Sequence, residues 1–595
     1  MRKAIGSLEE IFFLCASFAS LAASAVALFL RSHTPFVNHR VRYGFRHLPA
    51  ELLAAALFIA FVAFARPFLA RIPDLAIRPT RQFLAGIGGI FALFWVPVWF
   101  SGGFVQDDWL LLAAASIRKI IVFHPAYSWF TLDSVDGNFR PLGTVLYFGY
   151  ILKWFGPAAR AFTLGPLVLT LLASLVAFAI VRELGYSRIA AAAASLLFLS
   201  RGMIYTIVAW ASALGDGIAI LFCGLTALFI LKANRCSGSR ALLYHLLAWL
   251  CFAFAILGKQ SAFVTPLIVA LLLFLRPGQS SLPSLARRAA SAAFGLCIYT
   301  ATAAIVFLHA KSLLNAPSPY SIGLSLRTVF QTFAYPTWYF LIVQFPDRYH
   351  AANFLPGILG LAIVAILILL ACRFPSLLGD RPRDLIFAGL AAAASISLFT
   401  LLGTRSAPYY GCMAAFWFSI ALAIVLTRFG PPRADNPLAR VCCFLFCLLV
   451  VTGFAEVRIE QTGLVSSGGY IWGTYGMDTE RAIQASMEGQ FAKSPEKPVL
   501  ELIDCPFANP YTSIALLDAP TIERILLYNS RAGVYTANNH QGLGPSDTFA
   551  GLTDTQSYQW TQPLDPATAR KILTDRETLR LRCIGGTISQ AADEP

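Results

Sequence analysis

The sequence predicts an all-α polytopic membrane domain followed by a small C-terminal soluble domain of α/β or α+β class. Of the 595 residues, 57% are hydrophobic and only 13% are charged, whereas soluble domains carry roughly 25% charged residues. Apolar runs long enough to cross a bilayer, roughly 17–25 residues each, recur through the first three quarters of the chain. The runs stop near Glu456, where Gly, Ser, Asp, Thr and Gln become more frequent.

About thirteen apolar segments are predicted to span the membrane, with the N-terminus inside. The segment 11–30 is too long for the apolar part of a signal peptide and lacks a small-residue cleavage site, so we expect a retained first helix. The segments suggest an N-terminal hairpin (1–82), a transmembrane domain (83–455) and an extracytoplasmic soluble domain (456–595). The thirteen apolar segments lie at 11–30, 50–70, 83–101, 161–181, 189–210, 213–232, 241–257, 262–276, 289–309, 353–372, 385–403, 408–427 and 438–455.

The net charge of +15 is concentrated in the membrane part of the chain. Residues 1–455 hold 35 Lys and Arg against 14 Asp and Glu, whereas residues 456–595 hold 11 against 17. Loops rich in Arg alternate with loops that carry few cations, which marks the Arg-rich side as cytoplasmic. Since no basic patch falls on a water-soluble face, we expect no nucleic-acid partner. The basic sets are Arg182 and Arg188; Lys232, Arg235 and Arg240; Arg276, Arg287 and Arg288; Arg373, Arg381 and Arg383; and Arg428, Arg433 and Arg440.

This topology places the loops 102–160 and 310–352 and the C-terminal domain on the outer face. The loop 31–49 disagrees, because it also lies outside and carries four arginines. The loop 102–160 contains short amphipathic pieces with Trp and Tyr, which are typical of helices lying in the membrane interface. The segment Phe330–Gln344 has the same composition. As a fourteenth span, it would instead place the C-terminal domain in the cytoplasm.

Three segments of the C-terminal domain have a recognisable pattern. Val499–Ile503 is predicted as a strand, and the alternation over Thr578–Cys583 predicts a second strand with one buried face. Ala519–Leu527 is predicted as a helix, with a proline near its first turn. At about 140 residues the domain is large enough to bury a core of its own. In an oxidising compartment its two cysteines, Cys505 and Cys583, are expected to pair.

Two adjacent carboxylates, Asp107 and Asp108, follow the apolar run from about Phe83 to Phe100. Ionisable residues so close to the hydrocarbon layer are costly and usually functional. In a loop beyond the helix, one carboxylate could act as a general base on an acceptor hydroxyl or amine, while the other binds a metal or positions the chain. The alternative is a solvated helix-end pair, or a pair that caps the next amphipathic helix.

Three cations on the predicted outer side are candidates: Lys259 and Arg405, each the lone cation of its loop, and Arg140 in the loop 102–160. Each could hold a phosphate oxygen. The alternatives are an interfacial arginine that snorkels towards water and loop cations in solvent. His124 is expected to pack or to lie at the interface rather than to act as a ligand. Asp216, near the outer start of a span, is expected to cap that helix or to pack as a polar residue rather than to act in catalysis.

Several of these motifs together resemble the GT-C class of membrane glycosyltransferases. They are the Asp107–Asp108 pair in the first large outer loop, the run Asn138–Leu142 that enters a helix, and Gly258–Ser261 between two later spans. The resemblance covers roughly residues 83–455 and is to the group that contains protein O-mannosyltransferases and the lipid A aminoarabinose transferase. It implies inverting transfer of a sugar from a polyprenyl-phosphate carrier to a glycan, lipid or protein acceptor, on the outer face of the cell's inner (plasma) membrane.

The resemblance also implies residue roles. Asp107 would be the general base and Asp108 a supporting or metal-binding residue, although the two could be reversed. A divalent metal is the one cofactor considered. The chain departs from the group in having two apparent spans, rather than one, before the acidic loop, and in carrying Gln260 where relatives often have an acidic residue or Gly. The donor phosphate would meet Arg140, Lys259 and Arg405, and the substrate pocket would include His124, Asn138 and Gln260.

Two other functions fit a polytopic protein. A transporter or flippase of lipid-linked glycans would place ionisable groups near mid-span and show repeated halves. In this sequence the polar residues gather at one face, and no repeated half is evident. A non-catalytic assembly protein would use the C-terminal domain as its working part, and it predicts no convergent site beneath that domain.

Overall fold

The structure is a computed structural model. It describes residues 80–101, 108, 111, 140–156, 158–275, 285–313, 326–340, 354–373, 381–400, 408–428, 437–462, 499–503, 524–529, 534–538, 561–575, 578–584 and 587–590.

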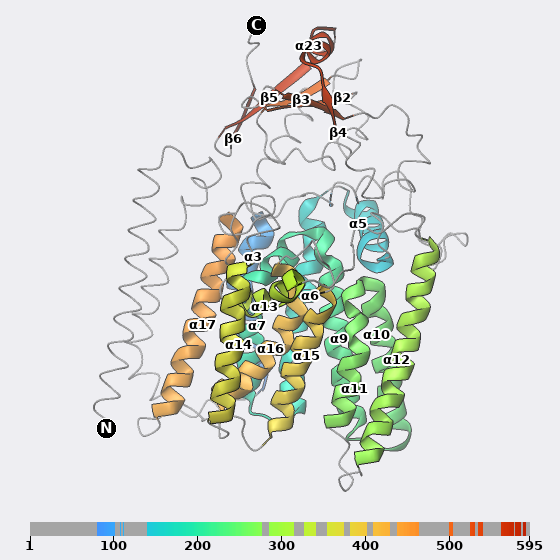
Figure 1. Ribbon diagram of the computed structural model, residues 1–595, viewed down its shortest axis with the longest axis vertical. Coiled ribbons are helices and arrows are strands. Elements are labelled where there is room, and N and C mark those ends of the chain that lie inside the picture. The colour runs from blue at the N-terminus through green and yellow to red at the C-terminus, as the bar shows by residue number, and fades with distance from the viewer. Residues whose placement is uncertain are drawn as a thin grey trace.

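Long apolar helices stand side by side as a bundle, and a small sheet lies beyond one end of it (Figure 1). The longer helices are α3 (Thr80–Ser101), α6 (Ala159–Glu183), α7 (Arg188–Leu199), α9 (Leu214–Ala233), α10 (Gly238–Gly258), α11 (Thr265–Leu275), α12 (Leu285–Leu313), α13 (Leu326–Phe340), α14 (Phe354–Arg373), α15 (Pro382–Thr400), α16 (Cys412–Thr427) and α17 (Pro437–Thr462). Shorter helices and helical turns lie between them in the chain: η2 (Pro141–Leu146), α5 (Tyr147–Phe155), η3 (Gly202–Ile204), α8 (Tyr205–Ala209), η4 (Ala211–Ala213), η5 (Gln260–Val264) and η7 (Pro408–Gly411).

Seven helices in the described part of the chain are long and apolar enough to cross a membrane, and the bent pair α7–α8 would make an eighth. Three shorter apolar helices accompany them, at 260–275, 356–369 and 438–454. Every segment predicted from residue 83 onward coincides with one of these helices, so their helical structure is confirmed. The predicted segments 11–30 and 50–70 lie outside the described residues, and the count of thirteen stays a prediction.

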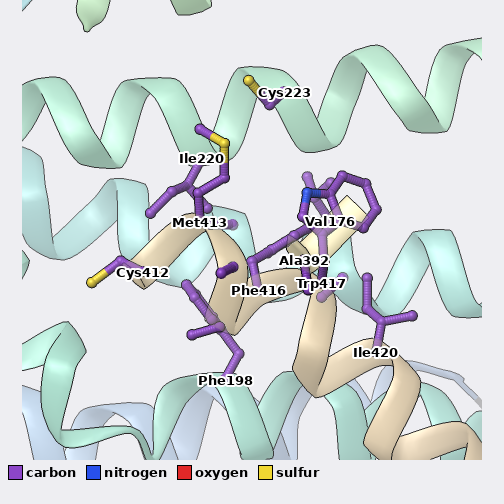
Figure 2. Close-up of a cluster of buried hydrophobic side chains, with 14 of the residues drawn as sticks. Val176, Phe198, Ile220, Cys223, Ala392, Cys412, Met413, Phe416, Trp417 and Ile420 are labelled. Carbon is purple, nitrogen blue, oxygen red and sulfur yellow. The ribbon is translucent and has the colours of Figure 1, made fainter. Parts of the chain in front are cut away.

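Helix α9 lies at the centre of the bundle. In the apolar stretch of the span Ala211–Ala233, 83% of the residues are buried within the protein. The corresponding share is 11% in the span Leu285–Leu308 of α12. Helix α9 packs mainly against α10 and α6, and also against α11 and α16. The main core combines large aromatic and small aliphatic side chains, as close packing requires. Figure 2 labels Val176, Phe198, Ile220, Cys223, Ala392, Cys412, Met413, Phe416, Trp417 and Ile420 in this core.

The span formed by α7 and α8 bends by 62° at a break that contains Arg201. Arg201 is fully buried. Its guanidinium donates hydrogen bonds to the carbonyl oxygens of Leu197 (3.0 Å), Tyr339 (3.1 Å) and Leu449, and to the hydroxyl of Ser200 (2.8 Å). A side chain that inserts at a break in the helical ladder is a common cause of a sharp kink. One arginine thus joins α7 to α13 and α17.

Helix α13 falls in the segment predicted to lie at the membrane interface. It is seen nearly end-on in Figure 1, so it runs across the direction of the upright helices. Its side chains Ala334, Tyr335, Trp338 and Tyr339 are buried in the main core. The segment is therefore a helix packed into the bundle, and at 15 residues it is shorter than a typical span.

The C-terminal region contains a six-stranded mixed sheet in the order β4-β3-β2-β1-β5-β6. Its elements are β1 (Val499–Ile503), β2 (Arg524–Asn529), β3 (Val534–Asn538), β4 (Thr561–Leu564), α23 (Pro566–Asp575), β5 (Thr578–Ile584) and β6 (Thr587–Gln590). Strand β1 is parallel to β2 and β5, and the remaining pairs are antiparallel. Buried residues of β1, β2 and α23 (Val499, Leu526 and Leu573) form a separate small core.

The predicted strands at Val499–Ile503 and Thr578–Cys583 are confirmed. The helix predicted over Ala519–Leu527 is wrong where the structure describes it, because Arg524–Asn529 is the strand β2. A short apolar run does not distinguish a buried strand from a helix, and Leu526 is fully buried between two partner strands. The Cys505–Cys583 bridge stays a prediction, since both side chains lie outside the described part.

Candidate active site

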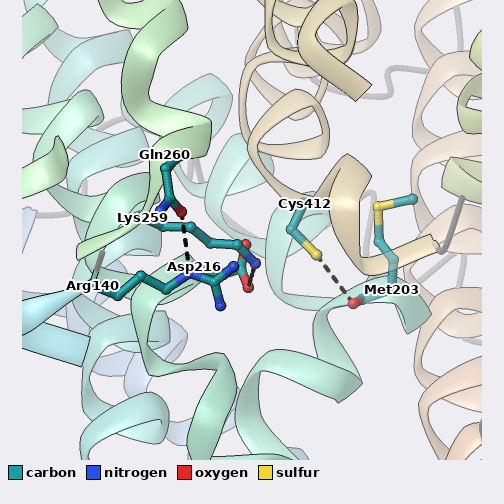
Figure 3. Close-up of polar contacts among 6 residues, drawn as sticks. All are labelled: Arg140, Met203, Asp216, Lys259, Gln260 and Cys412. Atoms are coloured by element: carbon teal, nitrogen blue, oxygen red, sulfur yellow. Dashed lines mark hydrogen bonds and ion pairs between the residues drawn. The ribbon is translucent and has the colours of Figure 1, made fainter. Parts of the chain in front are cut away.

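A buried ion pair lies at one end of the central helix. The Nζ atom of Lys259 is 2.5 Å from an Oδ oxygen of Asp216, and the two residues are only 8% and 5% exposed. Asp216 is in the first turn of α9, and Lys259 directly follows α10. Burying either charge alone would be strongly unfavourable, so each residue depends on the other to remain charged. Figure 3 shows the two side chains meeting tip to tip.

A second cation lies beside this pair. Arg140 immediately precedes η2, and its Nε atom donates a hydrogen bond to the side-chain oxygen of Gln260 (3.1 Å). Proline at the first position of η2 favours a helical start there, directly after the arginine. Arg140 is close enough for its positive charge to lower the pKa of Lys259. Two cations from distant segments are therefore neighbours at the bundle end.

Lys259 is held by charge and by aromatic faces. Burial lowers the pKa of Lys259, and the carboxylate of Asp216 opposes that shift. The ring centroids of Tyr409 and Tyr410 are 5.5 and 5.7 Å from its Nζ atom, within the range of cation–π attraction. Tyr410 in turn stacks on Phe399 at 4.8 Å. The ammonium group is thus fixed in place by groups from separate segments of the chain.

Three glycines allow these segments to approach. A Cβ atom on Gly143 of η2 would lie 3.1 Å from the Cα atom of Gly215, and one on Gly215 would lie 2.6 Å from the carbonyl oxygen of Gly258. A Cβ atom on Gly258 would overlap the side chain of Ile218. Small residues permit this kind of backbone contact between membrane helices. Since Asp216 and Lys259 directly follow two of these glycines, the backbone contact brings the charged pair together.

Asp108 lies at the start of the same central helix. It is fully buried, and one carboxylate oxygen accepts hydrogen bonds from both the backbone N–H (2.7 Å) and the hydroxyl of Ser212. Ser212 belongs to η4, one turn before Asp216. A helix N-terminus favours a negative charge, so this position stabilises the carboxylate. Asp108 is thus anchored at the beginning of α9; the capping role at the next amphipathic helix, which the sequence left open, concerns residues outside the described part and stays a prediction.

Tyr147 lies within electrostatic reach of Asp108. Burial raises the pKa of the Tyr147 hydroxyl above its ordinary value, and the negative charge of Asp108 adds to the effect. The hydroxyl donates to the carbonyl oxygen of Phe162 (2.6 Å) and accepts from the N–H of Gly165 (3.1 Å). Tyr147 is therefore a neutral residue that ties the start of α5 to α6 next to the acidic loop.

The structure gathers half of the residues proposed from the sequence. Asp108, Arg140, Lys259 and Gln260 lie around the N-terminal end of α9. The sequence favours capping or polar packing for Asp216, whereas the structure makes it the ion-pair partner of Lys259. Each of these residues follows a glycine beside an apolar span, but nothing in the local sequence pairs them across the 43 positions that separate them. The other candidates, Asp107, His124, Asn138 and Arg405, lie outside the described residues, and their roles stay predictions.

The metal role suggested for Asp108 also stays a prediction. Within the described ranges, no three His, Cys, Asp or Glu side chains are grouped as metal ligands. The two hydrogen bonds that Asp108 accepts from Ser212 involve one carboxylate oxygen and suit an ionised carboxylate.

No protein-family model matches the chain, and no curated protein matches it. Among solved structures, the chain is similar to ArnT from Cupriavidus metallidurans in the apo state, at 15% identity over 84% of this chain and 93% of that one, with a TM-score of 0.45. ArnT bound to undecaprenyl phosphate matches at 15% identity over 75% and 90%, with a TM-score of 0.41. The apo oligosaccharyltransferase of Archaeoglobus fulgidus matches at 13% identity over 75% and 69%, with a TM-score of 0.42.

These neighbours are enzymes of the GT-C class, the class that the sequence resembles. The likeness covers most of each chain but is loose, since all three TM-scores are below 0.5. The function of this chain therefore has to follow from the residues of its own site.

Proposed function

We propose that the protein is an integral-membrane glycosyltransferase that moves a sugar from a polyprenyl-phosphate-linked donor to an acceptor on the extracytoplasmic face. The proposal rests on one observation. Arg140 and Lys259 lie together with the buried carboxylates of Asp216 and Asp108 at one end of an apolar helix bundle. A lipid-linked substrate requires this combination, because its tail stays in the membrane while its phosphate needs cations at the edge of the hydrocarbon layer.

The two cations suit the phosphate of the donor. When the sugar departs, negative charge grows on the phosphate oxygen that held it, and fixed positive groups stabilise that charge without reorganising. Lys259 is held by Asp216 and two tyrosine rings before any substrate arrives. Arg140 adds a planar guanidinium that binds phosphate oxygens through paired hydrogen bonds. Asp216 acts in this scheme as the positioning residue that keeps Lys259 charged.

The acidic pair supplies the other half of the reaction. Asp108 is anchored by Ser212, so we assign it a positioning role and assign the general base to the preceding residue, Asp107. The base removes the proton from an acceptor hydroxyl or amine, whose lone pair attacks the anomeric carbon. The bond between that carbon and the phosphate oxygen breaks, the polyprenyl phosphate leaves with the electron pair, and the configuration of the sugar inverts.

The position of the site along α9 supports an extracytoplasmic reaction. Asp216 is in the first turn of this helix and Lys232 is in its last turn. Lys232 introduces one of the Arg-rich loops, and such loops stay in the cytoplasm. The site therefore lies at the opposite, outer end of the bundle. The same orientation puts residues 456–595 outside, where they could cover the site or help to select the acceptor.

The direct test uses purified protein in lipid nanodiscs. Binding of undecaprenyl phosphate and release of sugar from undecaprenyl-phosphate-linked donors are measured for the wild type, Lys259→Ala and Arg140→Ala. The matched control is Lys153→Ala, because Lys153 is an exposed cation on α5. We expect each site variant to weaken lipid binding about tenfold or more and the control to match the wild type. Wild-type protein that neither binds the lipid nor releases sugar would refute the proposal.

The alternative function is a flippase. The observation that favours it is the broken span at Arg201. Transporters often bind substrate where helices are interrupted. Arg201, however, already donates to four oxygen atoms of the protein, which leaves little of its guanidinium for a substrate. A flippase would move the lipid-linked sugar across a vesicle membrane without releasing it, so the sugar-release assay separates the two functions.

A further inference from the structure

A buried tyrosine hydroxyl next to the candidate active site has no hydrogen-bond partner among the described residues. Tyr335 on α13 is 3% exposed, and its hydroxyl oxygen is enclosed without a donor or an acceptor. Buried hydroxyl groups are nearly always paired, because an unpaired one has lost its bonds to water and gained nothing in return. An unpaired buried hydroxyl of this kind requires an explanation.

Tyr335 packs directly against the turn that carries the two active-site tyrosines. A Cβ atom on Gly411 would lie 2.7 Å from the Cδ1 atom of Tyr335. Burial raises the pKa of Tyr335 well above its ordinary value, and the neighbouring Tyr410 and Cys412 add to the effect. The phenol therefore keeps its proton. The thiol of Cys412 is not a partner for it, since that thiol donates to the carbonyl oxygen of Met203 at 3.1 Å.

The same neighbours connect Tyr335 to the ion pair. The ring of Tyr410 is 5.7 Å from the Nζ atom of Lys259, and Cys412 is close enough to influence the pKa of Lys259. Figure 3 shows Cys412 next to Lys259 and Asp216, on the opposite side of this pair from Arg140. Tyr335 is thus a neighbour of Tyr410 and Cys412, two residues that themselves lie close to Lys259.

We propose that Tyr335 recognises the transferred sugar, with its hydroxyl forming a hydrogen bond to a sugar hydroxyl. This inference rests on the proposed glycosyltransferase function. The charged groups Lys259 and Arg140 suit the phosphate, whereas a neutral phenol among aromatic rings suits an uncharged hydroxyl. Trp338, whose ring centroid is 5.1 Å from that of Tyr335, is one such ring. The hydroxyl is covered in this structure, so binding of the sugar requires the side chains over it to move.

The first part of the test compares two tyrosines on one helix. Tyr339 lies one turn after Tyr335 and is equally buried, but its hydroxyl pairs with the hydroxyl of Ser419 at 2.9 Å. Without any donor present, Tyr335→Phe should leave the Tm of the full-length protein unchanged or raise it, because no hydrogen bond is lost. Tyr339→Phe should lower the Tm, because it leaves Ser419 without this partner.

The second part measures lipid affinity in nanodiscs, using undecaprenyl phosphate and the same lipid carrying mannose, glucose or aminoarabinose. Tyr335→Phe should bind the bare lipid as the wild type does and should bind the preferred sugar-bearing lipid about tenfold more weakly. Tyr339→Phe should show no such difference between the two lipids.

The outcomes separate the two proposals. If the wild type binds none of these lipids, the proposed function itself fails. If the wild type binds them and Tyr335→Phe keeps full affinity for the sugar-bearing lipid, the recognition role fails alone. A fall in Tm as large as that of Tyr339→Phe would also overturn it, since the hydroxyl would then be paired within the protein.

Discussion

Gly215 and Gly258 touch so closely that a Cβ atom on Gly215 would lie 2.6 Å from the carbonyl oxygen of Gly258. The next residue after each glycine is charged, Asp216 in one case and Lys259 in the other, and these two form the buried ion pair. The backbone contact and the ion pair are therefore two aspects of one helix junction. Substitutions at this junction and in the groups around it can separate its structural role from its functional one.

The first prediction concerns the glycine contact. Gly215→Ala should lower both stability and activity, because the new methyl group meets backbone, which cannot move aside as a side chain can. Overpacking of this kind typically costs about 1–3 kcal/mol. Thermal unfolding and donor binding provide the measurements. The control is Gly89→Ala on α3, where a Cβ atom has no neighbour within 4 Å; removing a helical glycine there should be neutral or stabilise by roughly 0.5–1 kcal/mol. Equal effects at the two positions would argue against a critical contact.

The second prediction separates the structural and functional roles of the ion pair. Lys259→Met and Asp216→Asn should each destabilise the fold by about 3–5 kcal/mol, because each leaves a buried charge without its partner. The double variant should recover much of this loss, and a double-mutant cycle of unfolding free energies measures the recovery. Donor binding should not recover, because the lysine is still missing. Restored binding in the double variant would show that Lys259 does not contact the phosphate.

The third prediction is a shift in pH dependence. Burial lowers the pKa of Lys259 and the Asp216 carboxylate raises it, so removing the carboxylate lets the lysine lose its proton at a lower pH. Donor binding should therefore fall as pH rises, and the fall should begin at a lower pH in Asp216→Asn than in the wild type. Asp384→Asn is the matched control, because Asp384 is also buried but pairs with Tyr186, away from the site. Identical pH profiles for the wild type and Asp216→Asn would contradict this account.

The fourth prediction distinguishes the two adjacent aspartates. Asp108→Asn should lower the unfolding free energy by roughly 1.5–3 kcal/mol, since it weakens hydrogen bonds to an ionised carboxylate. Ser212→Ala, which removes one of the two donors, should have a smaller effect in the same direction. Asp107→Asn should abolish sugar transfer while the protein stays folded and inserted. Turnover by Asp107→Asn at the wild-type rate, measured with a lipid-linked donor, would eliminate Asp107 as the base.

The fifth prediction concerns the kinked span. Arg201→Met should destabilise the protein severely, by about 4 kcal/mol or more, because several oxygens lose their buried donor at once. Arg201→Lys should rescue only part of this loss, since an ammonium group lacks the planar arrangement of five donors. Thermal unfolding of both variants checks whether stability falls from the wild type to Arg201→Lys and then to Arg201→Met. If Arg201→Met were as stable as the wild type, the arginine would not hold α7, α13 and α17 together.

The sequence was sufficient for the periodic features of this protein. Apolar runs of spanning length predicted every long apolar helix of the described bundle from residue 83 onward, because a helix must satisfy its own backbone hydrogen bonds within lipid. Two strands of the C-terminal sheet followed from local pattern. The strand at Arg524–Asn529 did not, because its burial depends on partner strands that local sequence does not reveal.

The site was only partly visible in the sequence. The sequence identified Asp108, Arg140 and Lys259 as candidates, because charges close to apolar spans are costly and seldom incidental. Their grouping depended on helix packing. Asp216 and Lys259 are 43 positions apart, and Arg140 and Gln260 are 120 apart, so no local pattern could pair them. Likewise, Tyr335 and Tyr339 occupy similar positions on one helix, and only the packed structure shows which hydroxyl has a partner.

By itself, the sequence determined that the chain crosses a membrane repeatedly and carries its unusual charges at one face, because hydrophobicity and charge belong to individual residues. The tertiary structure decided which of those charges meet, which carboxylate pairs with Lys259 and which tyrosine keeps an unused hydroxyl. These relationships arise from close contacts between distant segments, such as Gly215 against Gly258, and a contact is a property of the packed helices rather than of either segment alone.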